Sequence, residues 1–173
     1  MTYKDYYING ITKLVLESDG ENLTGLWFDG SHDNSKHSDA ATKKNLPIFA
    51  QTKKWLDIYF SGKNPDFVPQ LKINNLTSFR KEVYEIMRHI PYGKTMTYGE
   101  IAEILTKKKG IKKMSAQAVG GAVGANQICI ILPCHRVVGK TNLVGFGGGI
   151  GNKKMLLEIE KQNVVEDIWE KQK

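Results

Sequence analysis

The sequence has few cysteines, histidines and prolines: two, four and five, respectively, among 173 residues. Two cysteines give no disulfide framework, and Cys129 and Cys134 would stand too far apart along one extended strand to bond each other. We therefore expect both thiols to be reduced and the protein to be cytoplasmic.

Long apolar runs are also absent. No stretch approaches the roughly 20 residues of a membrane-spanning helix, and residues 1–10 lack the basic segment and apolar core of a secretory signal. The chain has no internal repeat and no low-complexity tract. With 40% hydrophobic residues, it is predicted to be an ordinary globular protein without a membrane partner.

Positively charged residues outnumber negatively charged ones. The chain has 25 lysines and arginines against 18 aspartates and glutamates, a formal net charge of +7. This excess favours a polyanionic partner, nucleic acid first, although charge alone does not separate such a protein from an ordinary basic one.

The N-terminal region is expected to form a small sheet with one helix. Residues 6–28 have strand-like apolar patterning, interrupted by the turn signal Asp19-Gly20, which predicts a hairpin or meander. Residues 47–60 have helical apolar spacing, and Gly62 suits the end of that helix.

Two polar segments interrupt this region. Residues 29–45 are predicted to be a solvated loop, and no cysteine or tight histidine spacing supports a metal site at His32 and His37. Residues 63–75 carry two prolines and are predicted to be a linker, which places a domain boundary between residues 75 and 76.

The second region is predicted to be mostly helical. An apolar stripe over residues 79–90 indicates a helix that Thr77 or Ser78 can cap and that Pro91-Tyr92-Gly93 ends. A last helix is expected to start near Asn152.

Two short helices are predicted between the helix of residues 79–90 and the last helix, and together they fit a helix-turn-helix. Thr97 and Glu100 form a capping-box pattern at the start of the first, and Ser115 can cap the second. Lysines crowd the expected turn between them, where they would either contact phosphates or simply be solvated. These lysines are Lys107, Lys108, Lys109, Lys112 and Lys113.

The most informative segment surrounds Cys134. The apolar run of residues 128–132 is predicted to be a buried strand that Pro133 ends, with Cys134 at its exit. A thiol beside His135 and Arg136 is in a setting that favours the nucleophilic thiolate, although most buried cysteines are inert. Cys134 is therefore a candidate for covalent chemistry.

The hexapeptide PCHRVV, residues 133–138, resembles with its flanks the active-site segment of the O6-alkylguanine-DNA alkyltransferases, or methylated-DNA–protein-cysteine methyltransferases. Residues 78–105 are similar to the family's segment leading into its helix-turn-helix, and residues 116–126 to its recognition helix and the following turn. The resemblance is clear over about residues 76–163 and weak before them.

This resemblance implies an α/β protein with a small N-terminal sheet-and-helix domain, residues 1–75, and a mostly helical C-terminal domain with a helix-turn-helix, residues 76–173. It implies direct reversal DNA repair, in which each molecule irreversibly transfers one alkyl group from O6-alkylguanine, or O4-alkylthymine, to Cys134. The partner would be double-stranded DNA containing alkylated guanine, with the damaged nucleotide flipped out of the stack. No cofactor and no metal are implied, and we expect a monomer.

The resemblance also assigns catalytic roles. It implies Cys134 as the acceptor, His135 as the base that takes the thiol proton through a water, and Tyr98 as the acid that protonates the departing base. Asn126 would hold the turn after the recognition helix. From the residues alone, Tyr98 reads as helix packing and Asn126 as an ordinary helix-terminating residue.

A glutamate would orient the imidazole. Glu158 and Glu160 lie at opposite margins of the apolar stripe of the last helix, so periodicity leaves both open. The family motif selects Glu160.

Further residues are implied to hold the base and the DNA. The glycine-rich loop of residues 145–149 would close over the flipped base, although the bare pattern also suits a flexible connector. The main-chain carbonyls of Cys134 and Val137 would accept from the guanine amino group. The base pocket would comprise Val137, Phe146, Gly147 and Gly148. The DNA contacts would be Thr97, Tyr98, Gln117, Ala118, Gly121, Arg136, Lys107, Lys108 and Lys109.

Three residues depart from the family pattern. Gln117 replaces an arginine that fills the gap left by the flipped base, while Gln127 and Cys129 replace frequent prolines. The first change touches nucleotide extrusion, and the other two should affect rigidity.

Two other functions are considered. A binding protein that recognises alkylated bases without reacting, and recruits other repair factors, would lack the cysteine of this motif. A cysteine hydrolase would need turnover and an oxyanion hole. Stoichiometry discriminates between the three: one transfer per molecule, none, or many.

Overall fold

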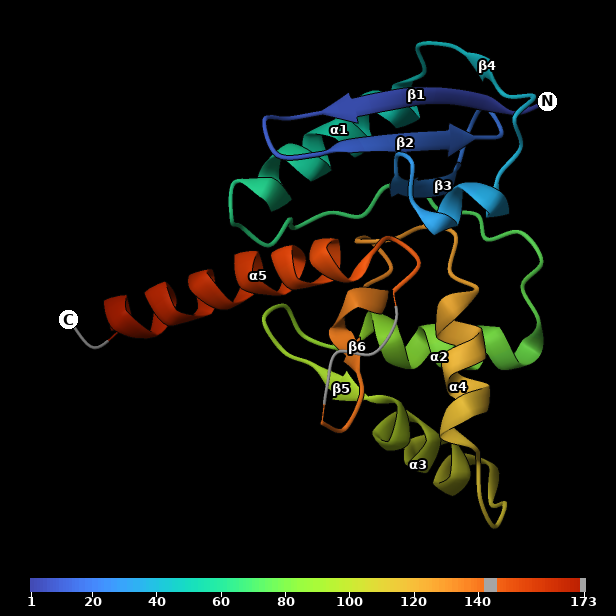
Figure 1. Cartoon of the computed structure of the whole chain (residues 1–173), viewed down its shortest axis with the longest axis vertical. Helices are drawn as coiled ribbons and strands as arrows, with labels where there is room; N and C mark the ends of the chain where they lie inside the picture. Colours follow the sequence, from blue (N-terminus) through green and yellow to red (C-terminus); the bar gives the residue numbers. More distant parts are fainter. Residues whose placement is uncertain (142–145, 172–173) are drawn as a thin grey trace.

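A computed structural model describes residues 1–141 and 146–171, and only the backbone of residues 162–171. A sheet with one helix against it lies above a group of shorter helices, and the last helix runs along the junction between them (Figure 1). One hydrophobic core extends through both parts, from Tyr7 in the first strand to Leu156 in the last helix. The boundary between residues 75 and 76 stays a prediction.

The sheet contains the predicted antiparallel meander and one additional strand. In the spatial order β3-β2-β1-β4, its strands are β1 (Tyr3–Ile8), β2 (Lys13–Ser18), β3 (Leu23–Phe28) and β4 (Thr42–Lys43). β4 pairs in parallel with β1, a pairing that the local pattern did not predict. Gly20, with φ +112, makes the turn after β2 in a conformation that strains other residues, as its turn signal predicted.

The predicted first helix is confirmed as α1 (Pro47–Phe60), which packs against β2 and β3. Pro47 stands at its start, where a missing N–H is harmless, and Gly62, with φ +91, follows its end. The apolar face of α1 thereby covers the sheet.

The two predicted polar segments are more ordered than expected. The predicted loop contains η1, a 3-10 helix over His32–Lys36, whose Asp33 is buried. The predicted linker is bonded to β3, because Leu23 N–H donates to the Gln70 carbonyl at 2.8 Å and Lys72 N–H donates to the Leu23 carbonyl at 3.0 Å. Tertiary pairing satisfies these backbones, and local polarity did not reveal it.

The helices of the second part are α2 (Ser78–Arg88), α3 (Tyr98–Lys109), α4 (Ala116–Gly124) and α5 (Ile150–Lys171). Their predicted caps are confirmed. Thr77 accepts from Arg80 N–H, both halves of the Thr97–Glu100 capping box form, and Ser115 caps α4. α4 packs against α2 and α3. The helix-turn-helix interpretation of α3 and α4 stays a prediction.

A two-stranded parallel ladder links the start of α3 to the segment after Cys134. It consists of β5 (Met96–Thr97) and β6 (Val137–Val138), and β6 follows η2 (Cys134–Arg136) directly. The ladder fixes the position of α3 relative to Cys134.

Candidate active site

The segment that leads to Cys134 is a buried turn, so the strand predicted over residues 128–132 is wrong. Its bonds to the sheet centre on Leu26, whose carbonyl accepts from Cys129 N–H at 3.0 Å. Ile130 has φ +69, a left-handed conformation that breaks an extended run. The turn is packed into the core, so it has the apolar sequence of a buried strand.

Asn126 closes this turn. Its Nδ2 donates to the carbonyls of Ile128 and Leu132, at 3.2 and 3.0 Å, and its Oδ1 accepts from Ile128 N–H at 3.1 Å. These bonds replace a strand ladder for buried backbone groups. Asn126 thus lies where the resemblance implied, and its part in catalysis stays a prediction.

Cys134 is buried, with 7% of its surface exposed, and lines a cavity of about 70 Å³. The thiol therefore faces a small, partly open cavity instead of bulk solvent. The other walls come from η1, α3, α4 and the glycine-rich loop, and include Asp33, Lys36, Tyr98, Gly120, Phe146 and Gly147.

The thiol is more strongly protonated than the sequence suggested. Burial raises the pKa of Cys134 to about 11, with a further rise from Asp33, while a hydrogen bond from Asn126 and the positive charge of Lys153 lower it. The expectation of a favoured thiolate is corrected. The neighbouring cation, Arg136, is engaged elsewhere, so reaction requires a base that removes the thiol proton.

Arg136 is an internal residue. Its Nε donates to Glu160 Oε1 at 2.7 Å, and its Nη1 donates to the Ile90 carbonyl at 2.9 Å. Only 9% of its surface is exposed. Arg136 therefore holds Glu160 in place, and its predicted contact with DNA stays a prediction.

Glu160 is the carboxylate that His135 contacts. Its Oε2 bonds His135 Nε2 and accepts from Tyr59 Oη at 2.6 Å, and its Oε1 accepts from Gly93 N–H at 3.0 Å. Glu160 is 1% exposed, whereas Glu158 is exposed to solvent. Tertiary packing thus separates the two glutamates that periodicity left open.

The charges of this pair suit proton acceptance. Burial works to raise the pKa of Glu160, but the hydrogen bond from His135 and the positive charge of Arg136 lower it to about 2. Burial lowers the pKa of His135 against the opposing effect of Glu160, so the imidazole rests neutral. His135 Nδ1 is buried and has no hydrogen-bond partner among the residues that the structure describes. One ring nitrogen is oriented by a carboxylate while the other is open to a proton.

Lys153 is a site residue that the sequence interpretation missed. It is fully buried, and its Nζ donates to the Val137 carbonyl at 2.7 Å. Burial lowers the pKa of Lys153 to about 8. The Val137 carbonyl, predicted to receive the guanine amino group, already accepts one bond and keeps a second lone pair. Lys153 shares the buried face of α5 with Leu156 and Glu160, and that spacing was the available signal.

Tyr98 stands at the first turn of α3 and forms part of the cavity wall. It is half-buried, and burial raises the pKa of its phenol, with a further rise from Cys134. Gly120, which also lines the cavity, lies against the Tyr98 ring, since a Cβ on Gly120 would stand 3.8 Å from it. The structure thus brings Tyr98 to the same cavity as Cys134.

The remaining predicted DNA contacts lie outside this cavity. Gln117, Ala118 and Gly121 are exposed on α4. Thr97 is half-buried, and its hydroxyl is occupied by the α3 cap. The lysines 107–109 form the last turn of α3, a correction of their expected place in the turn between the helices.

The glycine-rich loop packs closely against the protein as well as bordering the cavity. A Cβ on Gly148 would lie 2.6 Å from the Phe146 ring and 2.8 Å from the Phe28 ring, so no side chain fits there. Gly145, also predicted to belong to this loop, lies outside the described residues.

Within the described part of the chain, no group of three or more histidines, cysteines, aspartates or glutamates is placed to hold a metal ion. None of the helices described there is long and apolar enough to cross a membrane.

Comparison with known proteins places this geometry in a family. Residues 78–162 match the family model of the 6-O-methylguanine DNA methyltransferase DNA-binding domain. The methylated-DNA–protein-cysteine methyltransferase of Haemophilus influenzae is 37% identical over 162 residues, covering 92% of this chain and 86% of its own. The Mycobacterium leprae protein of the same name is 41% identical over 160 residues, covering 91% of this chain and 92% of its own.

Solved structures agree. The crystal structure of Mycobacterium tuberculosis O6-methylguanine methyltransferase superposes with a TM-score of 0.78 at 35% identity, covering 94% of each chain. A structure of the Mycobacterium tuberculosis protein in complex with DNA gives 0.77 at 34% identity, covering 93% of this chain and 94% of that one. Because the likeness extends over nearly the whole chain, the protein belongs to the methylated-DNA–protein-cysteine methyltransferase family.

Proposed function

We propose that this protein repairs alkylated double-stranded DNA by moving an alkyl group from O6 of guanine, or O4 of thymine, to Sγ of Cys134. The observation that carries the proposal is the cavity lined by Cys134 beside the buried His135–Glu160 pair. Family membership and the DNA complex of a relative support the same activity. Each molecule acts once, because the acceptor is part of the chain.

The first step is removal of the thiol proton. With the pKa of Cys134 near 11, few molecules carry a thiolate at neutral pH. His135, neutral at rest and open at Nδ1, takes the proton through a water, and Glu160 stabilises the resulting imidazolium. Sγ then attacks the alkyl carbon, so the S–C bond forms as the C–O6 bond breaks.

The second proton transfer neutralises the leaving group. The electron pair of the broken bond stays on the guanine, which gains a proton from Tyr98. The raised pKa of Tyr98 keeps its phenol protonated until that moment. No cofactor takes part in either step.

DNA would approach the exposed face of α4. Gln117, Ala118 and Gly121 offer small or flexible side chains there, which suits close contact with a groove. The target nucleotide must leave the stack to reach a buried cysteine. We also infer a cytoplasmic location, since both cysteines are free and buried, as in a reducing compartment. The expected monomer stays a prediction.

The test is stoichiometric transfer. Incubation with a duplex containing O6-methylguanine should add one methyl group per molecule, and peptide mass mapping should place it on Cys134 and not on Cys129. The Cys134→Ser variant should bind the duplex without becoming methylated. Repeated turnover would indicate a hydrolase, and binding without any transfer a recognition protein; either result contradicts the proposal.

A further inference from the structure

The N-terminal region contributes an acidic side chain to the cavity that Cys134 lines. Asp33, in η1, is 5% exposed and forms part of the cavity wall. Its N–H donates to the Gly147 carbonyl at 3.2 Å. Its carboxylate covers Gly147 so closely that a Cβ on this glycine would stand 2.0 Å from Oδ1. Gly147 is therefore a glycine because Asp33 occupies the space of a side chain.

Lys36 holds this carboxylate in place. Its Nζ lies 2.6 Å from Asp33 Oδ1, and it donates to the carbonyls of Gly124 and Asn126 at 2.6 and 3.2 Å. One ammonium thus joins η1 to the end of α4 and to the turn before Cys134. Its side chain is 22% exposed against 7% for Asp33, so the carboxylate is the more deeply buried charge of the pair.

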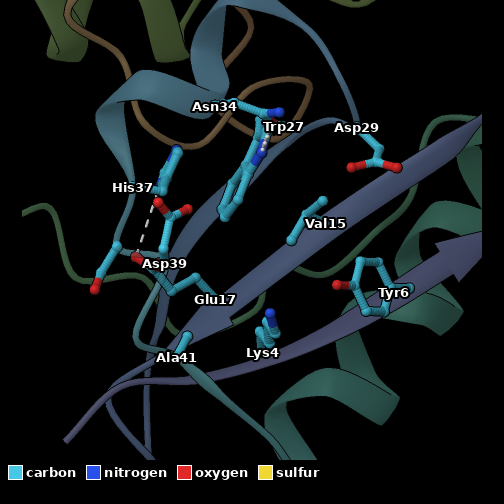
Figure 2. A pocket seen from close by; sticks show the side chains of 11 residues that line it. Lys4, Tyr6, Val15, Glu17, Trp27, Asp29, Asn34, His37, Asp39 and Ala41 are labelled. Atoms are coloured by element: carbon cyan, nitrogen blue, oxygen red, sulfur yellow. Dashed lines mark hydrogen bonds and ion pairs between the residues drawn. The ribbon is translucent and has the colours of Figure 1, made fainter.

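The outer side of η1 is anchored as well. Asn34 Oδ1 accepts from Trp27 Nε1 at 2.6 Å, and the His37 ring stacks on Trp27 with centroids 3.5 Å apart (Figure 2). Glu17 lies beside His37 Nδ1 at 3.4 Å. Because both sides of the helix are held, Asp33 cannot swing away from the cavity without breaking these contacts.

We propose that Asp33 is a specificity-determining residue that makes the acceptor cavity selective for uncharged alkyl groups and against anionic ones. A like charge brought beside a buried carboxylate is repelled strongly, since little water is present to screen it. The proposal deepens the alkyl transfer proposed above and rests on it for the DNA substrates.

The electrostatic influence of Asp33 already extends to the thiol. Beyond the effect of burial, Asp33 raises the pKa of Cys134 more than Lys36 lowers it. At the thiol, the pair therefore acts as a net negative charge. Lys153 also acts on this thiol and lowers its pKa. Besides burial, the negative charge of the Cys134 thiolate in turn raises the pKa values of Cys129, Tyr84 and Tyr98.

Two small reagents test the proposal without DNA. Iodoacetamide and iodoacetate are nearly equal in size and differ in charge, and both alkylate thiols. The rate ratio of iodoacetamide to iodoacetate at Cys134, relative to the ratio for free cysteine, measures selectivity alone. Asp33→Asn should lower this ratio by about fivefold or more, whereas Asp39→Asn, the same charge change at an exposed position, should leave it unchanged.

Lys36→Met should change the rate ratio in the opposite direction, because it leaves the negative charge of Asp33 uncompensated. It should raise the ratio above that of the unaltered protein. It also decides the question if Asp33→Asn fails to fold. Equal ratios in the unaltered protein and in whichever of the two variants folds would overturn the proposal.

DNA substrates then connect selectivity to repair. Duplexes carrying O6-carbamoylmethylguanine or O6-carboxymethylguanine present the same neutral and anionic groups on the base. Asp33→Asn should speed transfer of the carboxymethyl group relative to the carbamoylmethyl group by a similar factor. If no alkyl group, methyl included, is transferred by any variant, the proposed function fails, while the reagent ratios still decide the role of Asp33.

Discussion

At the scale of single residues, Glu160 organises the site. One buried carboxylate accepts from Tyr59, Gly93 and Arg136 and contacts His135. A buried charge with this many donors is stable as an anion, and it fixes both the orientation and the charge preference of the imidazole.

Replacing Glu160 by Gln should slow methyl transfer by about a hundredfold or more, because an amide cannot stabilise the imidazolium. Glu158→Gln, at an exposed position of the same helix, is the matched control and should transfer at nearly the original rate. Single-turnover rates on methylated duplex measure both. If Glu158→Gln were the slower variant, the carboxylate that assists His135 would be Glu158, and our assignment of Glu160 would be wrong.

The protonated state of Cys134 also makes a prediction. With its pKa raised to about 11, the rate of its modification by iodoacetamide should climb about tenfold per pH unit through neutral pH and level off only near pH 11. Mass spectrometry of the Cys134 peptide over a pH series measures this, with Cys134→Ser reporting any reaction of Cys129. A plateau near pH 8 would show an ordinary, solvated thiol.

At the scale of elements, α3 carries a cluster of lysines in its last turn, and α4 exposes small residues and Gln117. The basic last turn of α3 lies where the helix dipole favours cations, so these lysines also suit the helix itself. Lys109 is engaged, with its Nζ 2.9 Å from Glu82, while the contact of Lys107 with Glu103 is exposed and weak.

Replacing Lys107 and Lys108 by Ala should weaken binding to methylated and unmethylated duplex about equally. The slope of log affinity against log salt should become shallower by roughly one unit per lost phosphate contact. Lys109→Ala, which removes a paired lysine, should change the slope less. Binding isotherms at several salt concentrations test this, and an unchanged slope in the double variant would mean that these lysines are only solvated.

On α4, Gln117 is exposed near the start of the helix. Arginine there would add a charge and a planar group that stacks in the gap of a flipped base. Gln117→Arg should therefore speed repair of duplex DNA but hardly change the rate on free O6-alkylguanine, which needs no extrusion. Single-turnover rates on the two substrates test this; equal gains on both would mean that residue 117 acts on the chemical step.

At the scale of the whole molecule, the two parts share one core and one site. Tyr59 of α1 reaches Glu160 of α5, and Lys36 of η1 reaches the end of α4. The N-terminal region therefore holds the His135–Glu160 pair through Tyr59 and forms part of the cavity wall through η1.

Tyr59→Phe should lower the free energy of unfolding by about 1–3 kcal/mol, because the buried carboxylate loses a donor. It should also slow methyl transfer, since Glu160 is then held less firmly. Tyr7→Phe removes a similar bond, to Asp57 at 2.8 Å, within the N-terminal part, and should leave the transfer rate unchanged. Urea unfolding measures the stability of both variants, and single-turnover rates measure their methyl transfer. If Tyr59→Phe transfers as fast as Tyr7→Phe, Tyr59 does not assist the His135–Glu160 pair.

Local features of this fold followed from the sequence because they depend on neighbours along the chain. The caps at Thr77, Thr97 and Ser115 use hydrogen bonds within one helical turn, and Gly20 makes its turn by its own backbone freedom. The candidate nucleophile, Cys134, was found by its motif for the same reason.

Contacts between distant segments were decided by the tertiary structure alone. The apolar run before Cys134 suits a strand or a buried turn equally, and the long-range contact with Leu26 and the bonds from Asn126 select the turn. Likewise, Asp33 was predicted to lie in a solvated loop, and only packing buries it in the cavity wall. Packing also buries Lys153 in α5, which its charge did not suggest. Packing also reverses the expected state of the Cys134 thiol, because the pKa of a group depends on the dielectric and charges around it, which a linear pattern does not contain.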